Sequence, residues 1–144
     1  MDYLPSNGGD CVNRVAQIGG FPSVPSRTSA LPLHGSSCEA ETFSPPGHLA
    51  VYGNDRRKIA ELAASEPNLG QPLHKRLPYL QAEVVWAARE EMARTVEDVL
   101  TRRTRALLLD SSAAAEVAPL VAEILAAELH RDQAWQEHQV EAYR

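Results

Sequence analysis

The chain has 144 residues, of which 44% are hydrophobic and 23% charged, and its formal net charge is -5. This size and composition predict one globular domain with a modest core. The acidic balance argues against a general nucleic-acid binder, because such a protein needs a basic face for the phosphates. The longest apolar runs, residues 84–88 and 106–109, are far too short to cross a bilayer, so we expect no transmembrane segment.

Prolines and glycines separate the chain into two halves. Most of the ten prolines and eight glycines precede Gln81, whereas alanine and leucine, which favour helix, dominate after it. The sequence therefore predicts an all-α fold, a small helical bundle preceded by a Pro/Gly/Ser-rich extended segment. We expect residues 1–50 to be mostly loop and residues 51–144 to form the helical domain.

The N-terminal half is expected to hold little regular structure. Residues 1–10 are predicted to be a loop, and residues 12–18 about two turns of helix that Gly19 and Gly20 end. Residues 21–46 are predicted to be an extended connector.

The first full helix is expected to begin at Asp55, whose carboxylate suits the N-cap position. Ile59, Leu62 and Ala63 fall on one face of it, and Pro67 ends it. The main helical region begins shortly after the next connector. On its first helix the acids and arginines, Glu83 among them, are expected largely around the solvent face. The buried face is expected to comprise Val84, Val85, Ala88 and Met92.

Capping residues divide the rest of the chain. Residues 95–98 form a variant of the capping box, with Asp in place of Glu, and should start a helix through Arg103. Residues 106–109 are either a buried helix end or a buried turn. Asp110 and the two following serines offer N-caps for the next helix, and Asp132 caps a final helix towards Tyr143.

Pro119 interrupts an alanine-rich pattern. Because proline is tolerated in the first turn of a helix and disfavoured in the interior, we expect two helices here. The first should end at about residue 118, and the second should cover residues 119–129. The second is expected to bury Val121, Ile124, Leu125 and Leu129 together.

Several kinds of site are not indicated. Cys11 and Cys38 lack a CxxC spacing, so we expect free thiols in a reducing compartment. The five histidines lack metal-ligand spacing and are interpreted as surface or loop residues. No Gly-x-Gly-x-x-Gly follows a strand, which argues against a dinucleotide site of the usual kind.

Six charged side chains form the candidate set for a structural or functional role. They are Glu83, Glu90, Arg94, Asp98, Arg102 and Arg103. Paired carboxylates can perform acid–base catalysis, but each acid here has an arginine within helical reach, which favours ion pairing. We interpret the set as structural ion pairs, with Glu90–Arg94 and Asp98–Arg102 four residues apart. The alternative is a role in orienting the domain on a partner.

Arg103 is expected to project from the buried side, one turn after Val99, and to pair with Glu83 across two helices. Removing it should then cost about 3 kcal/mol, the order expected when a buried charge loses its partner. Arg105 is expected to be exposed. Residues 102–105 could bind phosphate through guanidinium forks. The favoured interpretation is a helix C-terminus whose cations oppose the macrodipole.

Residues 78–105 resemble the C-terminal helical domain of FAD-dependent glycerol-3-phosphate dehydrogenases and alpha-glycerophosphate oxidases. The most specific part is Glu-Asp-Val-Leu-x-Arg-Arg-Thr-Arg at residues 97–105. Residues 25–35 resemble the linker that leaves the catalytic domain, and residues 113–129 the Pro-interrupted helices of the family. Residues 6–9 depart from the helix expected there, and His130 stands where a helix-ending glycine is expected. Met1 followed by mismatched residues predicts a truncated reading frame or an excised domain.

The resemblance implies a non-catalytic domain of an enzyme that oxidises glycerol 3-phosphate to dihydroxyacetone phosphate. The family builds its FAD and substrate sites in the preceding portion, so no catalytic, cofactor-binding or metal residue is assigned here. The implied partner is the flavin-binding catalytic domain, with a homodimer as a further option. The implied location is the cytoplasm, either free or at the inner face of the membrane through the parent enzyme. The rival hypothesis is a stand-alone helical interaction module that binds a protein through Trp86 and Trp135.

Overall fold

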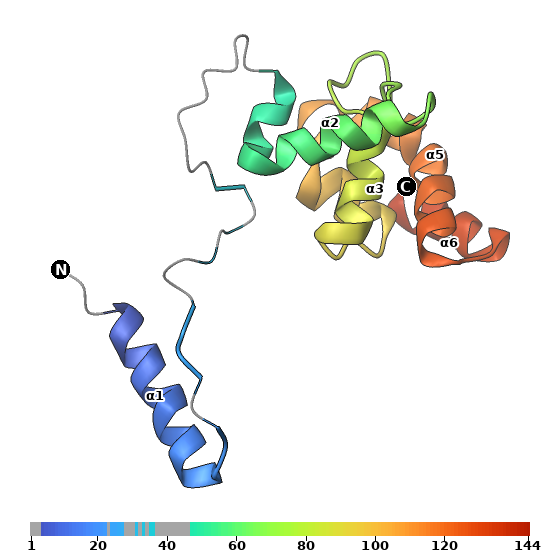
Figure 1. Ribbon diagram of the computed structural model, residues 1–144. Coiled ribbons are helices and arrows are strands. Elements are labelled where there is room, and N and C mark those ends of the chain that lie inside the picture. The colour runs from blue at the N-terminus through green and yellow to red at the C-terminus, as the bar shows by residue number, and fades with distance from the viewer. Residues whose placement is uncertain (1–3, 23, 28–30, 32, 34, 37–46) are drawn as a thin grey trace.

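The computed structural model describes residues 4–22, 24–27, 31, 33, 35–36 and 47–144, with side chains from Gly8 onward. Within that part the regular structure is helical apart from one antiparallel bridge between Pro72 and Leu80. Figure 1 shows the helices after residue 47 gathered in one bundle, while α1 (Leu4–Gly19) lies apart from them. The predicted all-α fold is confirmed.

The first helix is longer than expected. Residues 6–9, predicted to be loop and non-helical, lie inside α1. The helix predicted over residues 12–18 is present, and it ends as predicted at Gly19, followed by Gly20 at φ 68°. A proline in the first turn and glycines free of neighbouring atoms raise no steric obstacle to helix there. Val12, Val15 and Ile18 are each more than 60% exposed, so α1 buries no apolar face.

The connector predicted over residues 21–46 is described only in part. Its described residues form neither helix nor strand. Its other residues, among them His34 and Cys38, lie outside the described residues. Cys11 on α1 is an exposed free thiol.

A 3-10 helix and an α-helix follow, η2 (His48–Asp55) and α2 (Arg56–Ser65). Gly53 kinks η2 at φ 52° and ψ -126°, and a Cβ there would lie 2.2 Å from the Gly35 carbonyl oxygen, so only glycine fits. Asp55 precedes α2 as predicted, but its carboxylate makes no cap. It accepts instead from the Gly35 N–H at 3.1 Å, which ties residue 35 to the bundle.

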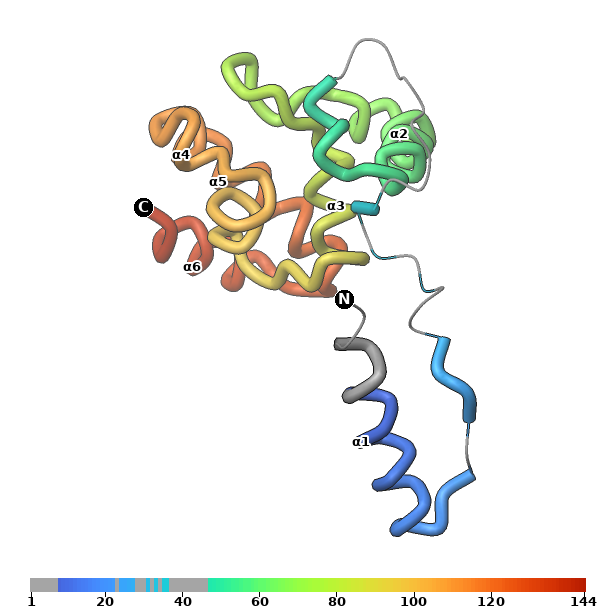
Figure 2. Tube along the Cα trace, turned by 90° about the vertical axis from the view of Figure 1, so that its left-hand side faces the viewer, coloured from blue at the N-terminus to red at the C-terminus, as the bar shows by residue number. Residues whose placement is uncertain are grey.

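The central helix, α3 (Gln81–Glu90), is buried on nearly all sides. Residues 82–88 are each at most 6% exposed. Val84, Ala87 and Ala88 belong to the larger core cluster, and Ala82 and Trp86 belong to a smaller one with Ile59 of α2. Figure 2 shows α3 between α2 and α5 (Ser111–Leu129). Because α3 has helices on both sides, the prediction of a solvent face that carries Glu83 is wrong.

Met92 is also misplaced by the prediction. The helix ends at Glu90, two residues before it, and Met92 is 76% exposed with φ 57°. It therefore cannot continue the apolar face of α3.

Two short helices follow, the π-helix η3 (Asp98–Arg103) and α4 (Ala106–Leu109). The variant capping box is confirmed: the Asp98 N–H donates to Thr95 Oγ1, and Asp98 Oδ2 accepts from the Thr95 N–H, both at 3.1 Å. In α4 only Ala106 is buried, and Leu108 is 77% exposed. The expectation that residues 106–109 are buried is therefore wrong.

Pro119 does not divide the following helix. α5 is continuous, and Asp110 caps it as predicted by accepting from the Ala113 N–H at 2.9 Å. Proline removes one hydrogen bond, but α5 packs against both α3 and α6 (Gln133–Tyr143), and this packing holds the helix together. Val121 and Leu125 are fully buried with Ile124 and Leu129 beside them, so the predicted face is confirmed.

His130 ends α5 in the left-handed conformation, at φ 53° and ψ 48°. The Arg131 N–H donates to the Ala126 carbonyl at 2.9 Å, which closes the C-terminal turn. A histidine thus performs the role for which a glycine was expected. Asp132 then caps α6, as predicted, through the Trp135 N–H at 2.9 Å.

We predict that His130→Gly raises the free energy of unfolding by about 0.5 to 1 kcal/mol. The left-handed conformation costs a residue with a Cβ about 1 kcal/mol or more, and glycine avoids this cost at some expense in unfolded-state entropy. Because the His130 side chain is exposed, little contact is lost. Urea melts monitored by circular dichroism measure the change. His130→Ala is the control, and a stabilisation equal to that of the glycine variant would contradict the explanation.

Candidate functional site

A buried carboxylate joins η2 to α3. Glu83 is 1% exposed and meets three groups. Its Oε1 accepts from the Tyr52 hydroxyl at 3.0 Å, and its Oε2 accepts from the Leu80 N–H at 2.6 Å. His48 Nε2 lies 2.8 Å from Oε2. A carboxylate in this environment is stable only when its oxygens are bonded in this way, so the network fixes η2 on the start of α3.

The network also fixes the state of Tyr52. Burial, and then the charge of Glu83 beside it, raise the pKa of Tyr52 well above its ordinary value of 10.0. The phenol therefore remains a protonated donor across the physiological range. On the other side of the network, the His48 ring meets the Tyr79 ring edge to face, with 6.1 Å between centroids.

A pocket of about 680 Å³ adjoins this network. His48, Tyr52 and Tyr79 line it together with Glu91, and its basic wall comprises Arg102, Arg103 and Arg105. We call it the Arg105 pocket. The pocket thus brings His48, Tyr52 and Tyr79 together with arginines of η3 and of the residues that follow it.

Arg103 does not pair with Glu83. Its Nε and Nη2 donate to the Glu91 carbonyl at 3.1 and 2.6 Å, and the Glu91 carboxylate lies 3.6 Å from Nε. The reason is that Glu83 is directed towards η2 and already has three partners. Because the Arg103 side chain is 33% exposed, the expected loss of about 3 kcal/mol on its removal has no basis in the structure.

The two pairs expected from helical spacing differ in outcome. Arg102 contacts Asp98, four residues earlier, and Glu97 at 2.8 Å. Burial alone would raise the pKa of Asp98, but hydrogen bonds from the Arg94 N–H, Thr95 and Arg102 outweigh it and lower that pKa. Arg94 is not paired with Glu90. It donates instead to the Ala88 and Ala93 carbonyls at 2.9 and 2.8 Å, because α3 ends before the expected register is completed.

Two histidines are engaged rather than free at the surface. Besides His48, His74 Nε2 lies 3.2 Å from the Glu116 carboxylate. In the described residues no group of three or more His, Cys, Asp or Glu is arranged to hold a metal ion. Among the same residues no helix is both long and apolar enough to cross a membrane.

The sequence interpretation missed the pairing of Glu83 with His48 and Tyr52. These residues lie 35 and 31 positions from Glu83, so helical spacing carries no signal for them. The one available hint was a pair of polar aromatic side chains, His48 and Tyr52, just before Asp55, in a segment to which no helix was assigned.

We predict that Tyr52→Phe lowers the free energy of unfolding by about 1.5 to 3 kcal/mol at pH 7, because it removes a hydrogen bond to a buried carboxylate. In the wild type the Tyr52 hydroxyl makes its full contribution to the free energy of unfolding below pH 10. That contribution falls above pH 10, where the unfolded phenol ionises while the folded one stays protonated. The difference in the free energy of unfolding between the wild type and Tyr52→Phe should therefore become smaller above pH 10. Urea melts from pH 7 to 11 measure it, and a difference that widens would contradict the assignment.

The helical part of the chain, which contains the Glu83 network, matches a known protein family. Residues 47–136 match the family described as the C-terminal domain of alpha-glycerophosphate oxidase. The mitochondrial glycerol-3-phosphate dehydrogenase of Bos taurus is 30% identical over 152 residues, which cover 94% of this chain and 21% of that enzyme. A probable mitochondrial glycerol-3-phosphate dehydrogenase of Caenorhabditis elegans is 45% identical over 102 residues, covering 67% of this chain and 14% of the relative.

A mitochondrial glycerol-3-phosphate dehydrogenase of Arabidopsis thaliana is 37% identical over 95 residues, covering 65% of this chain and 15% of the plant enzyme. This chain thus spans about a fifth or less of the length of these relatives. No solved structure matches the chain.

The relatives correct one expectation. The location expected above, in the cytoplasm or at the inner face of the membrane, is wrong: the relatives are named as mitochondrial enzymes. The match to the family covers η2 through the first turn of α6, including every residue of the Glu83 network. The chain belongs to the family of the C-terminal domain of alpha-glycerophosphate oxidase.

Proposed function

We propose that this chain serves as the non-catalytic helical domain of an FAD-dependent glycerol-3-phosphate dehydrogenase, and that it packs against and stabilises the catalytic portion. The observation that carries the proposal is the family match over residues 47–136, together with relatives that are named as glycerol-3-phosphate dehydrogenases. The oxidation of glycerol 3-phosphate to dihydroxyacetone phosphate then belongs to the whole enzyme. Residues 1–50 are assigned to the end of the catalytic portion and its linker, and residues 51–144 to the helical domain.

The described residues do not suit FAD. A dinucleotide is commonly held where a strand passes through a glycine-rich loop into a helix, whose N-terminus receives the pyrophosphate. The part of the chain that the structure describes contains helices joined by caps and turns, and within that part no β-strand precedes any of them. We therefore assign FAD to the catalytic portion and derive no chemical step from residues of this chain.

The alternative of a stand-alone interaction module is less well supported. Trp86 is only 6% exposed, packs with Ile59, and has the Lys58 ammonium 5.9 Å from its ring centroid. Trp135 is partly buried against the larger core cluster. The two aromatic side chains named for that alternative thus serve the interior of this fold, and little of them is left for a partner.

The proposal predicts the behaviour of a chimeric enzyme. In the nematode relative, the region that matches this chain is replaced by the corresponding residues of this chain. We expect the chimera to retain flavin and to oxidise glycerol 3-phosphate in a dye-reduction assay. A variant of the relative that lacks the region should lose flavin faster, because the catalytic portion then exposes the surface that the domain covers. The isolated 144-residue chain should show no oxidation.

Two outcomes would contradict the proposal. One is oxidation of glycerol 3-phosphate by the isolated chain. The other is a chimera that holds flavin no longer than the variant without the region, since the domain would then contribute nothing to the catalytic portion.

A further inference from the structure

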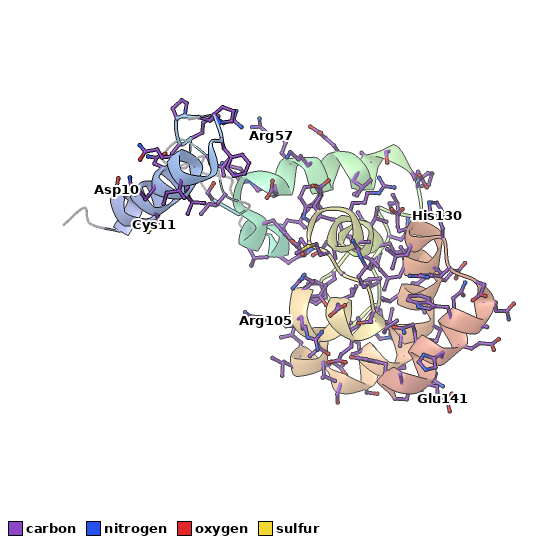
Figure 3. The ribbon with its side chains drawn as sticks, turned by 90° about the horizontal axis from the view of Figure 1, so that it is seen from below. Asp10, Cys11, Arg57, Arg105, His130 and Glu141 are labelled. Atoms are coloured by element: carbon purple, nitrogen blue, oxygen red, sulfur yellow. The ribbon has the colours of Figure 1, made fainter. Side chains whose placement is uncertain are left out.

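The Arg105 pocket contains one cation that nothing in the described structure neutralises. Arg102 is held by two acids, and Arg103 by the carbonyl and carboxylate of Glu91. The Arg105 guanidinium makes no hydrogen bond or ion pair with any described residue. Figure 3 shows its side chain reaching into solvent at the edge of the bundle.

Other polar groups line the same pocket as Arg105. Tyr79 and His48 both belong to it. Burial and Glu83 raise the pKa of Tyr79 above its ordinary value, and the charge of Arg105 acts on it in the opposite direction, so the two side chains are near each other. A guanidinium and a phenol that line one pocket are donors suited to a carboxylate, whereas His48 Nε2 is already bonded to Glu83.

Strained backbone borders the pocket at two places. Arg105 lies at φ 57° and ψ 25°, and Met92, which follows Glu91, lies at φ 57°. The buried Thr104 enforces the first of these: its hydroxyl donates to the Val99 carbonyl at 2.8 Å and accepts from the Ala106 N–H at 3.4 Å. Backbone strain of this kind persists where the structure over-determines it, and it is concentrated at binding sites. Each of the three non-glycine residues with positive φ among those described, Met92, Arg105 and His130, stands at the C-terminal end of a helix.

Exposed apolar side chains lie beside these polar groups. Val51 lines the pocket and is 80% exposed, and Met92, which directly follows the lining residue Glu91 in the chain, is 76% exposed. A free phosphate would gain nothing from them, whereas a protein surface combines an arginine anchor with apolar contacts of this kind. The pocket therefore suits an acidic side chain that a protein presents together with apolar neighbours.

We propose that the Arg105 pocket is the docking surface for the catalytic portion and receives a carboxylate from it. This inference rests on the function proposed above. The chain spans about a fifth of the length of its relatives, so most of such an enzyme lies outside it. The family match begins at residue 47, directly before His48, which opens η2 and lines the pocket. The chain that precedes the helical domain thus reaches the bundle at this pocket.

The test uses the nematode chimera with a charge reversal, Arg105→Glu. We expect flavin to be released about tenfold faster than from the unmodified chimera, because the reversal places like charges together at the interface. Arg131→Glu makes the same change in charge next to His130, on the opposite side of the bundle in Figure 3, and should leave the release rate unchanged. Urea melts of the isolated chain should show equal midpoints for the two variants, since both side chains are exposed.

Each outcome bears on a separate claim. A chimera that holds no flavin even without the substitution overturns the proposed function and this inference with it. A stable chimera in which Arg105→Glu and Arg131→Glu behave alike overturns the docking surface alone. Saturable binding of inorganic phosphate to the isolated chain that Arg105→Glu abolishes, with no effect on the chimera, would replace docking by a small-anion site.

Discussion

The bonding of one buried carboxylate determines how the two parts of this helical fold are joined. Glu83 has 1% of its surface exposed and cannot be left unbonded without a large loss of stability. Its partners come from η2, through His48 and Tyr52, and from the residue just before α3, through the Leu80 N–H. Any arrangement that moved η2 away from α3 would leave this charge without donors. The position of the segment that leads into the bundle is therefore tied to α3.

The helix that carries this carboxylate, α3, is unusual because it is buried on nearly all sides. Most helices at the surface of a small domain expose one face, but α3 carries packing on both sides, with α2 on one and α5 on the other. Its small residues, Ala82, Ala87 and Ala88, allow neighbouring helices to approach closely. On the side of α3 that faces η2, Glu83 places a buried carboxylate whose two oxygens are both hydrogen-bonded. Two hydrophobic clusters of different size are thus connected through a single ten-residue helix.

Features encoded over a few residues were predictable from the sequence. The capping box at residues 95–98 and the caps by Asp110 and Asp132 depend on side chains three residues from their partners, and all three are present. The all-α fold and the buried face of α5 follow from composition and helical periodicity in the same way.

Features set by distant packing were not predictable. Pro119 remains inside a helix because α3 and α6 hold α5 together, and Asp55 gives up its cap to bond residue 35. The burial of Glu83 depends on residues more than 30 positions away. The position of Arg105 depends on Thr104, which closes a π-helical turn against Val99 and forces the next residue into the left-handed conformation. Helical periodicity treats each of these residues as an ordinary member of its helix, so it assigns them the wrong role.

The central claim, that Glu83 holds η2 on the bundle, is tested most directly by native-state hydrogen exchange on Glu83→Gln. Glutamine keeps the shape but offers one acceptor oxygen where the carboxylate offers two, so a donor loses its partner. The account predicts that amides of η2 and the Leu80 amide lose protection, while those of residues 121–126 in α5 keep theirs. Unchanged protection across residues 48–55 would contradict it.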